Sequence, residues 1–155
     1  MAAEAGDRLL AFLRELEAVR IAESRWQLDG SIWQAVVDVE PRRWLGLAFE
    51  AVDPVTGKCA TYDIDTDLYD LSQPRQREFA EEIERDIIQF LDNLRKGAVL
   101  QGNDGEKFVL VFPLGNAYIR VVQGRFAGSA STYPDLAAAL AGGDHVPLSR
   151  PHPQA

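Results

Sequence analysis

Residues 74–97, PRQREFAEEIERDIIQFLDNLRKG, decide the fold because they contain the clearest amphipathic pattern in the chain. Their apolar residues recur three or four positions apart, the spacing of one face of an α-helix: Phe79, Ile83, Ile87, Phe90 and Leu94. Pro74 suits a first helical turn, and Arg95, Lys96 and Gly97 are typical of a helix end. The segment predicts a long helix whose apolar face lies on a sheet.

Three segments before this helix alternate apolar and polar residues, as antiparallel strands with one buried face do. They are residues 31–39, 44–52 and 58–66. Pro54 and Gly57 lie between the second and third segments, where they favour a hairpin turn. Short connections of this kind predict antiparallel neighbours in one sheet.

Weaker patterns complete the predicted organisation. They indicate an N-terminal helix from about Ala5 to Arg20, further strands at 98–101, 108–114 and 118–122, and a short helix from Pro134 to Gly142. Residues 21–30 fit neither a helix nor a strand. The predicted fold is α+β, with a mainly antiparallel sheet of five to six strands against the long central helix. We expect one domain over residues 1–143 and a Pro-rich, flexible tail over residues 144–155.

The composition of the chain limits which kinds of partner it can bind and in which cellular compartment it is expected. With 155 residues, 46% of them hydrophobic, the chain can bury a core without disulfides or metal. Its net charge of −8 opposes binding to nucleic acid phosphates and to anionic membranes. Cys59 has no second cysteine to pair with, and no segment has the roughly 18 apolar residues of a membrane span. A cytoplasmic protein is expected.

The sequence contains no established catalytic or cofactor-binding motif. Both histidines, His145 and His152, lie in or beside the Pro-rich tail, so a Ser-His or Cys-His pair has no obvious base. No P-loop, nucleophile elbow or dinucleotide fingerprint is present. We therefore expect no catalytic residues and no cofactor.

The acidic run YDIDTDLYD, residues 62–70, is the main candidate for a functional site. It imitates the start of a calcium loop but has Leu68 in place of the required glycine and Pro74 in place of the distal glutamate, so no metal site is predicted. Two interpretations remain, a solvated edge that discourages strand pairing and an acidic recognition patch. The predicted partner-binding residues are Asp63, Asp65, Asp67, Tyr69, Asp70 and Trp44.

Trp44 belongs to this set because alternation places it opposite the core face of its strand. An exposed tryptophan on a sheet is a candidate binding anchor. The alternative is a Trp44 covered by the first helix or by a dimer partner.

With these features the chain resembles the small acidic immunity proteins encoded beside bacterial polymorphic or contact-dependent toxins. The resemblance lies in size, acidity and order of elements, and in Tyr62-Asp-Ile-Asp, the helix from Phe79 to Leu94 and the closing Tyr133-Pro-Asp-Leu-Ala-Ala-Ala-Leu. It implies a protein that neutralises a toxin with a basic surface by masking its active or binding site. It transfers no site residues.

Two other functions compete with this one. The chain also resembles type III secretion chaperones, which run helix, three strands, helix, strands and helix and form homodimers. A long middle helix and a short, alanine-rich final helix depart from that pattern. The third hypothesis is a carboxylate or metal-dependent enzyme built on Asp63 and Asp65.

Overall fold

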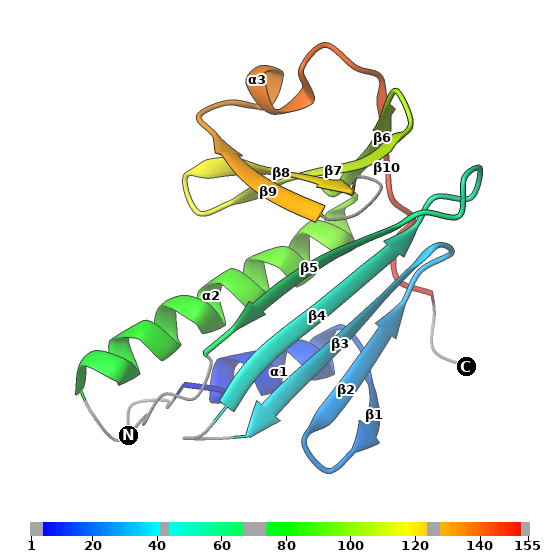
Figure 1. Ribbon diagram of the computed structural model, residues 1–155. Helices are drawn as coiled ribbons and strands as arrows, with labels where there is room; N and C mark the ends of the chain where they lie inside the picture. Colours follow the sequence, from blue (N-terminus) through cyan, green and yellow to red (C-terminus); the bar gives the residue numbers. More distant parts are fainter. Residues whose placement is uncertain (1–4, 41–43, 67–73, 124–127, 153–155) are drawn as a thin grey trace.

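The computed structural model describes residues 5–40, 44–66, 74–123 and 128–152. These residues form two five-stranded antiparallel sheets with a long helix between them (Figure 1). Sheet A has the order β1 (Val19–Ala22), β2 (Arg25–Asp29), β3 (Trp33–Glu40), β4 (Trp44–Val52), β5 (Cys59–Asp65). Sheet B has the order β10 (His145–Pro147), β6 (Leu100–Asp104), β7 (Lys107–Leu114), β8 (Ala117–Gln123), β9 (Gly128–Tyr133). The helices are α1 (Asp7–Glu15), α2 (Pro74–Lys96) and α3 (Leu136–Leu140).

Sheet A has one buried face because its strands alternate as the sequence predicts. Its inward residues are almost fully buried: Trp33, Ala35, Val37 and Val39 in β3, and Leu45, Leu47, Phe49 and Ala51 in β4. Helices α1 and α2 lie on that face, as Figure 1 shows. The opposite face of sheet A remains uncovered by them.

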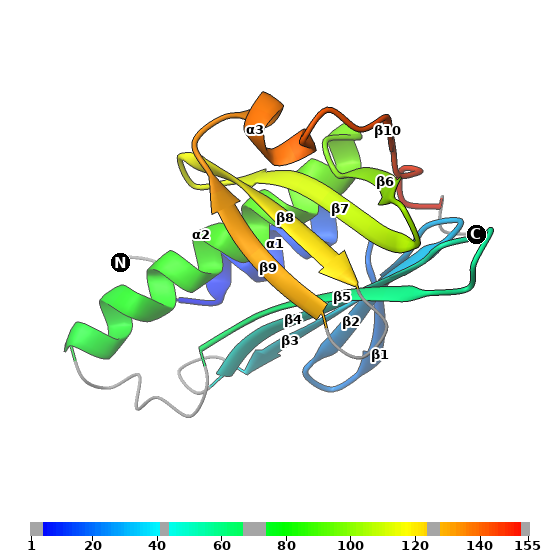
Figure 2. The ribbon, with the colours of Figure 1, turned by 45° about the horizontal axis from the view of Figure 1, so that its top comes forward.

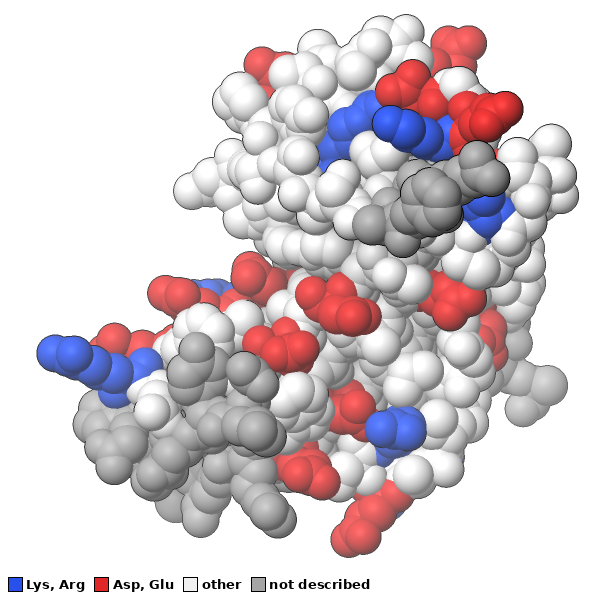
Figure 3. Space-filling model, in the orientation of Figure 1, with Lys and Arg blue, Asp and Glu red and all other residues white. Residues whose placement is uncertain are grey.

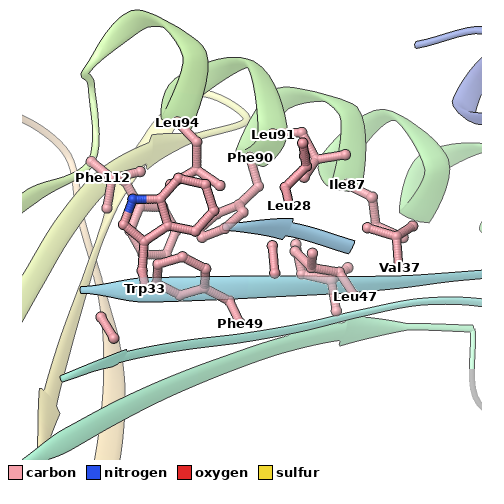
Figure 4. Close-up of a cluster of buried hydrophobic side chains, with 14 of the residues drawn as sticks. Leu28, Trp33, Val37, Leu47, Phe49, Ile87, Phe90, Leu91, Leu94 and Phe112 are labelled. Atoms are coloured by element: carbon pink, nitrogen blue, oxygen red, sulfur yellow. The ribbon is translucent and has the colours of Figure 1, made fainter. Parts of the chain in front are cut away.

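Helix α2 joins the two sheets into one core. The Phe90 ring lies 4.9 Å from the Phe49 ring of sheet A and 4.9 Å from the Phe112 ring of sheet B, both edge-on. Tyr62 of β5 also packs against Phe112, at 5.0 Å. Figure 4 shows Phe49, Phe90 and Phe112 close together beside α2. The α+β class and the long central helix are confirmed, and the strands divide between two sheets.

Helix α1 is shorter than the predicted range from Ala5 to Arg20. It ends at Glu15, and Glu17 adopts a positive φ of 59° that turns the chain into β1. The unassigned residues 21–30 form most of the β1–β2 hairpin, in which the Arg20 guanidinium lies 5.7 Å from the Trp26 ring centroid. Local periodicity misses this hairpin because β1 is exposed along its whole length and has no buried face to signal it.

Strand β9 of sheet B was not predicted, and β6 extends beyond the predicted residues 98–101. The small residues of β9 are exposed and show no alternation, but they pair with β8 from Tyr118 to Gln123. Residues 102 and 103, expected in a turn, belong to β6, where a Cβ at Gly102 would lie 2.7 Å from the Asp144 carbonyl oxygen. The missing Cβ therefore lets the chain that leads into β10 approach β6 closely.

Residues 144–155 were expected outside the domain as a flexible tail, and the structure places much of this segment within the fold. His145–Pro147 is strand β10, paired with β6. Beyond it, the Trp33 indole Nε1 donates to the Ser149 carbonyl at 2.9 Å, and the His152 amide donates to Asp29 O at 2.8 Å. These partners lie in or beside β2 and β3, so the tail connects the two sheets, which composition alone does not indicate.

Candidate functional site on the open face of sheet A

The side of sheet A that faces away from α1 and α2 is the candidate site and is called the open face. Residues directly opposite on neighbouring strands point to the same side, so the strand register defines its members. Three rows cross the sheet: Arg25, Asp38, Gly46 and Asp65; Gln27, Val36, Ala48 and Asp63; Asp29, Gln34, Glu50 and Thr61. Glu40 and Trp44 form a fourth, shorter row.

Trp44 lies across Gly46 on the open face. A Cβ built on Gly46 would be 2.9 Å from the indole Nε1, so the absence of a side chain at 46 leaves room for the ring. Trp44 is half-buried in this position. Across the sheet, Gly46 pairs with Asp38 on β3 and with Asp65 on β5. The indole therefore lies over a position whose neighbours on the two adjacent strands are Asp38 and Asp65, and Asp65 was predicted as a partner-binding residue.

The open face is strongly acidic. The four rows contain six carboxylates, Asp29, Asp38, Glu40, Glu50, Asp63 and Asp65, and one basic residue, Arg25. Arg25 Nε forms an ion pair with Asp38 at 2.7 Å, so its charge is already neutralised. Figure 3 shows acidic side chains spread over this side of the molecule.

Two ionisable groups on this side of β5 have raised pKa values. Partial burial, and then the neighbouring Asp65 charge, raise the pKa of the Asp63 carboxyl. Burial, and then a hydrogen bond to Glu50 and its negative charge, raise the pKa of the Cys59 thiol. Like charges are therefore held together here, and Cys59 is less disposed to form a nucleophilic thiolate.

The structure brings together half of the predicted partner-binding residues. Trp44, Asp63 and Asp65 lie on the open face, whereas Asp67, Tyr69 and Asp70 fall outside the described residues. Sequence reasoning missed Asp38, Glu50 and Gly46. The alternation of β3 and β4 carried the signal, since it places all three on the same side as Trp44.

The chemistry available on the open face favours binding. Carboxylates form charge-assisted hydrogen bonds to Lys and Arg, and an accessible indole offers both apolar area and a cation–π surface. Within the described parts of the chain, no three His, Cys, Asp or Glu side chains gather as the ligands of a metal ion would.

Comparison of the chain with protein-family models, with curated proteins and with solved structures finds no match. Among the described residues, no helix is long and apolar enough to cross a membrane.

Proposed function

We propose that this protein is a non-catalytic binding protein that uses the open face of sheet A to cover a basic surface on a partner protein. The observation that supports this most strongly is the Trp44 indole lying over Gly46, whose neighbours on the adjacent strands are Asp38 and Asp65. Binding energy at protein interfaces concentrates on aromatic anchors, and surrounding charges set the association rate and the choice of partner.

The placement of charge on β5 supports the same proposal. Asp63 and Asp65 lie on one side of a single strand, and the raised pKa of Asp63 reflects an unfavourable environment for its ionised form. A basic partner would relieve this repulsion by supplying the opposite charge. Carboxylates kept at a cost to stability are typical of surfaces that serve binding.

Within this class we propose a bacterial immunity protein that neutralises a toxin in the cytoplasm. An acidic sheet face can occlude a toxin site that carries Lys and Arg, because complementary charges favour rapid encounter and exclude the toxin's substrate. Size, acidity and the order of elements, in which the chain resembles such proteins, support this role.

Co-expression tests the immunity role directly. The product of the adjacent upstream gene is expressed alone and together with this protein, and growth is followed while the complex is sought by affinity purification. We expect the upstream product to arrest growth and this protein to restore it and to copurify. Absence of both rescue and complex would remove the immunity proposal.

A second experiment tests the surface with the partner identified in this way. We expect Trp44→Ala to weaken binding by about 30-fold or more, as loss of an interface anchor does. The pair Asp63→Asn and Asp65→Asn should slow association and flatten its dependence on salt. The control is Glu106→Gln with Asp144→Asn, which removes the same charge at two exposed positions, one in the β6–β7 turn and one just before β10. It should leave binding unchanged. Equal effects of the two double variants would move the interface off the open face.

A further inference from the structure

A cavity of about 400 Å³ opens at one end of the open face, beside the β2–β3 connection and the end of β4. This volume lies near the lower limit of protein sites that hold small molecules or single side chains. Its wall includes Ser31, Ile32, Gln34, Glu50, Val52 and Pro54. The wall therefore joins an apolar part to a carboxylate.

The strand register holds these two parts next to each other. The Val52 amide donates to the Ile32 carbonyl at 2.8 Å, which places the aliphatic residues side by side. One step further along the strands, Glu50 pairs with Gln34, and Gln34 pairs with Asp29 on its other side. An occupant would meet aliphatic groups first and then Gln34, which has Asp29 on one side and Glu50 on the other.

We propose that this cavity receives the side chain of a lysine or arginine from the partner protein, with its methylene stem against Ile32, Val52 and Pro54 and its cation at Glu50. Long basic side chains bury an apolar stem while keeping a charged head at a polar group, which matches the division of this wall. The proposal rests on the proposed function and adds the chemistry of one subsite to it.

Charge complementarity favours this occupant over others. Among the described residues that line the cavity, Glu50 is the one with a charged side chain, so an anionic group would be repelled. A purely apolar side chain would fit the aliphatic part but would desolvate the carboxylate without pairing it. A basic side chain satisfies both parts.

A matched pair of probes tests the subsite on the full-length protein. Nα-acetyl-lysine N-methylamide is titrated into ¹⁵N-labelled protein, and Nα-acetyl-norleucine N-methylamide, which has a similar aliphatic chain without the ammonium group, is the control. We expect saturable amide shifts at Ile32, Gln34 and Val52 with the lysine probe, and weaker binding of the norleucine probe. Glu50→Gln should raise the Kd of the lysine probe about two- to fivefold, the range of one exposed ion pair.

Variants separate failure of the subsite from failure of the proposed function. Glu82→Gln, an exposed carboxylate on α2 and away from the open face, should leave the Kd of the lysine probe unchanged. Absence of saturable shifts, equal affinity for both probes, or no effect of Glu50→Gln would overturn the subsite. If partner binding then still requires Trp44, the proposed function stands without the subsite. If the lysine probe binds as expected but the Trp44 and Asp63/Asp65 variants bind the partner normally, the proposed function fails instead.

Discussion

At the scale of single residues, Gly46 controls where the Trp44 ring lies. We expect Gly46→Ala to displace the indole, because the new Cβ would be 2.9 Å from its Nε1. The free energy of unfolding should change by about 0.5 kcal/mol or less, since Trp44 can move toward solvent. The indole N–H resonance of Trp44 in a ¹⁵N spectrum reports the displacement. Thr61→Ala, at an exposed position two rows away on the open face, is the control, and an unmoved Trp44 signal in Gly46→Ala would contradict the packing described.

Asp63 and Asp92 should change the stability of the protein in opposite directions. Burial and Asp65 raise the folded pKa of Asp63 above its ordinary value of 3.8, so its ionised form destabilises the fold at neutral pH. Burial alone would raise the pKa of Asp92, but hydrogen bonds from Lys96 and Arg95 outweigh it and lower that pKa, so its ionised form stabilises the fold.

We therefore expect Asp63→Asn to raise the Tm at neutral pH and Asp92→Asn to lower it. The Asp63 effect should vanish below pH 3.8, where the carboxyl is protonated in both states. The Asp92 effect should fade as pH drops through the lowered folded pKa. Thermal unfolding followed by circular dichroism across this range measures both, and shifts of the same sign at neutral pH would contradict the assigned environments.

At the scale of elements, a residue of α2 caps α1. Gly6 has no side chain to cap the helix, and Glu84 Oε2 accepts from the amides of Gly6 at 2.6 Å and Leu9 at 3.2 Å instead. Arg8 pairs with the other carboxylate oxygen at 2.7 Å. Glu84 is fully buried, so this cap forms only when α1 docks on α2.

We expect Glu84→Ala to lower the free energy of unfolding by about 1–3 kcal/mol, because it leaves the buried amides without an acceptor. Glu84→Gln should lose less, since its amide oxygen can still accept. Urea denaturation gives the stability, and hydrogen exchange in α1 shows where it is lost. Glu82→Ala, an exposed position on the same helix, is the control. A loss no larger than that of Glu82→Ala would contradict the capping role.

The elements differ in how far sequence predicts them. Helix α2 was predicted because its apolar residues repeat over 23 residues and both ends carry boundary signals. The end of α1 was missed because Leu16 and Val19 continue the helical spacing after the chain has turned at Glu17. Strands β1 and β9 were missed because neither buries a face, so pairing with a neighbour alone defines them.

At the scale of the whole molecule, Phe90 of α2 contacts both sheets and contributes to their shared core. We expect Phe90→Ala to lower the free energy of unfolding by about 3–5 kcal/mol, because its ring packs against Phe49 and Phe112. Both sheets should lose protection together, as measured by hydrogen exchange at Val37 in sheet A and Leu110 in sheet B. Leu136→Ala, at a partly exposed position in α3, should have a much smaller effect. Exchange that rises in one sheet alone would show two independent units.

The sequence by itself determined which segments form the long helix and the main strands, and which side of each strand is polar, because those properties follow from local periods of 3.6 and 2. Tertiary structure decided that the strands divide between two sheets, that β10 and the following residues join them, and that Asp38, Glu50 and Trp44 share a surface with Asp63 and Asp65. Alternation with a period of two predicts on which side of a strand a residue lies, but it does not predict which strand will pair beside it. Strand pairing depends on contacts between distant segments, such as those of Phe90 with both sheets. The pairing that buries this shared core is favoured, because burial of apolar surface stabilises the fold.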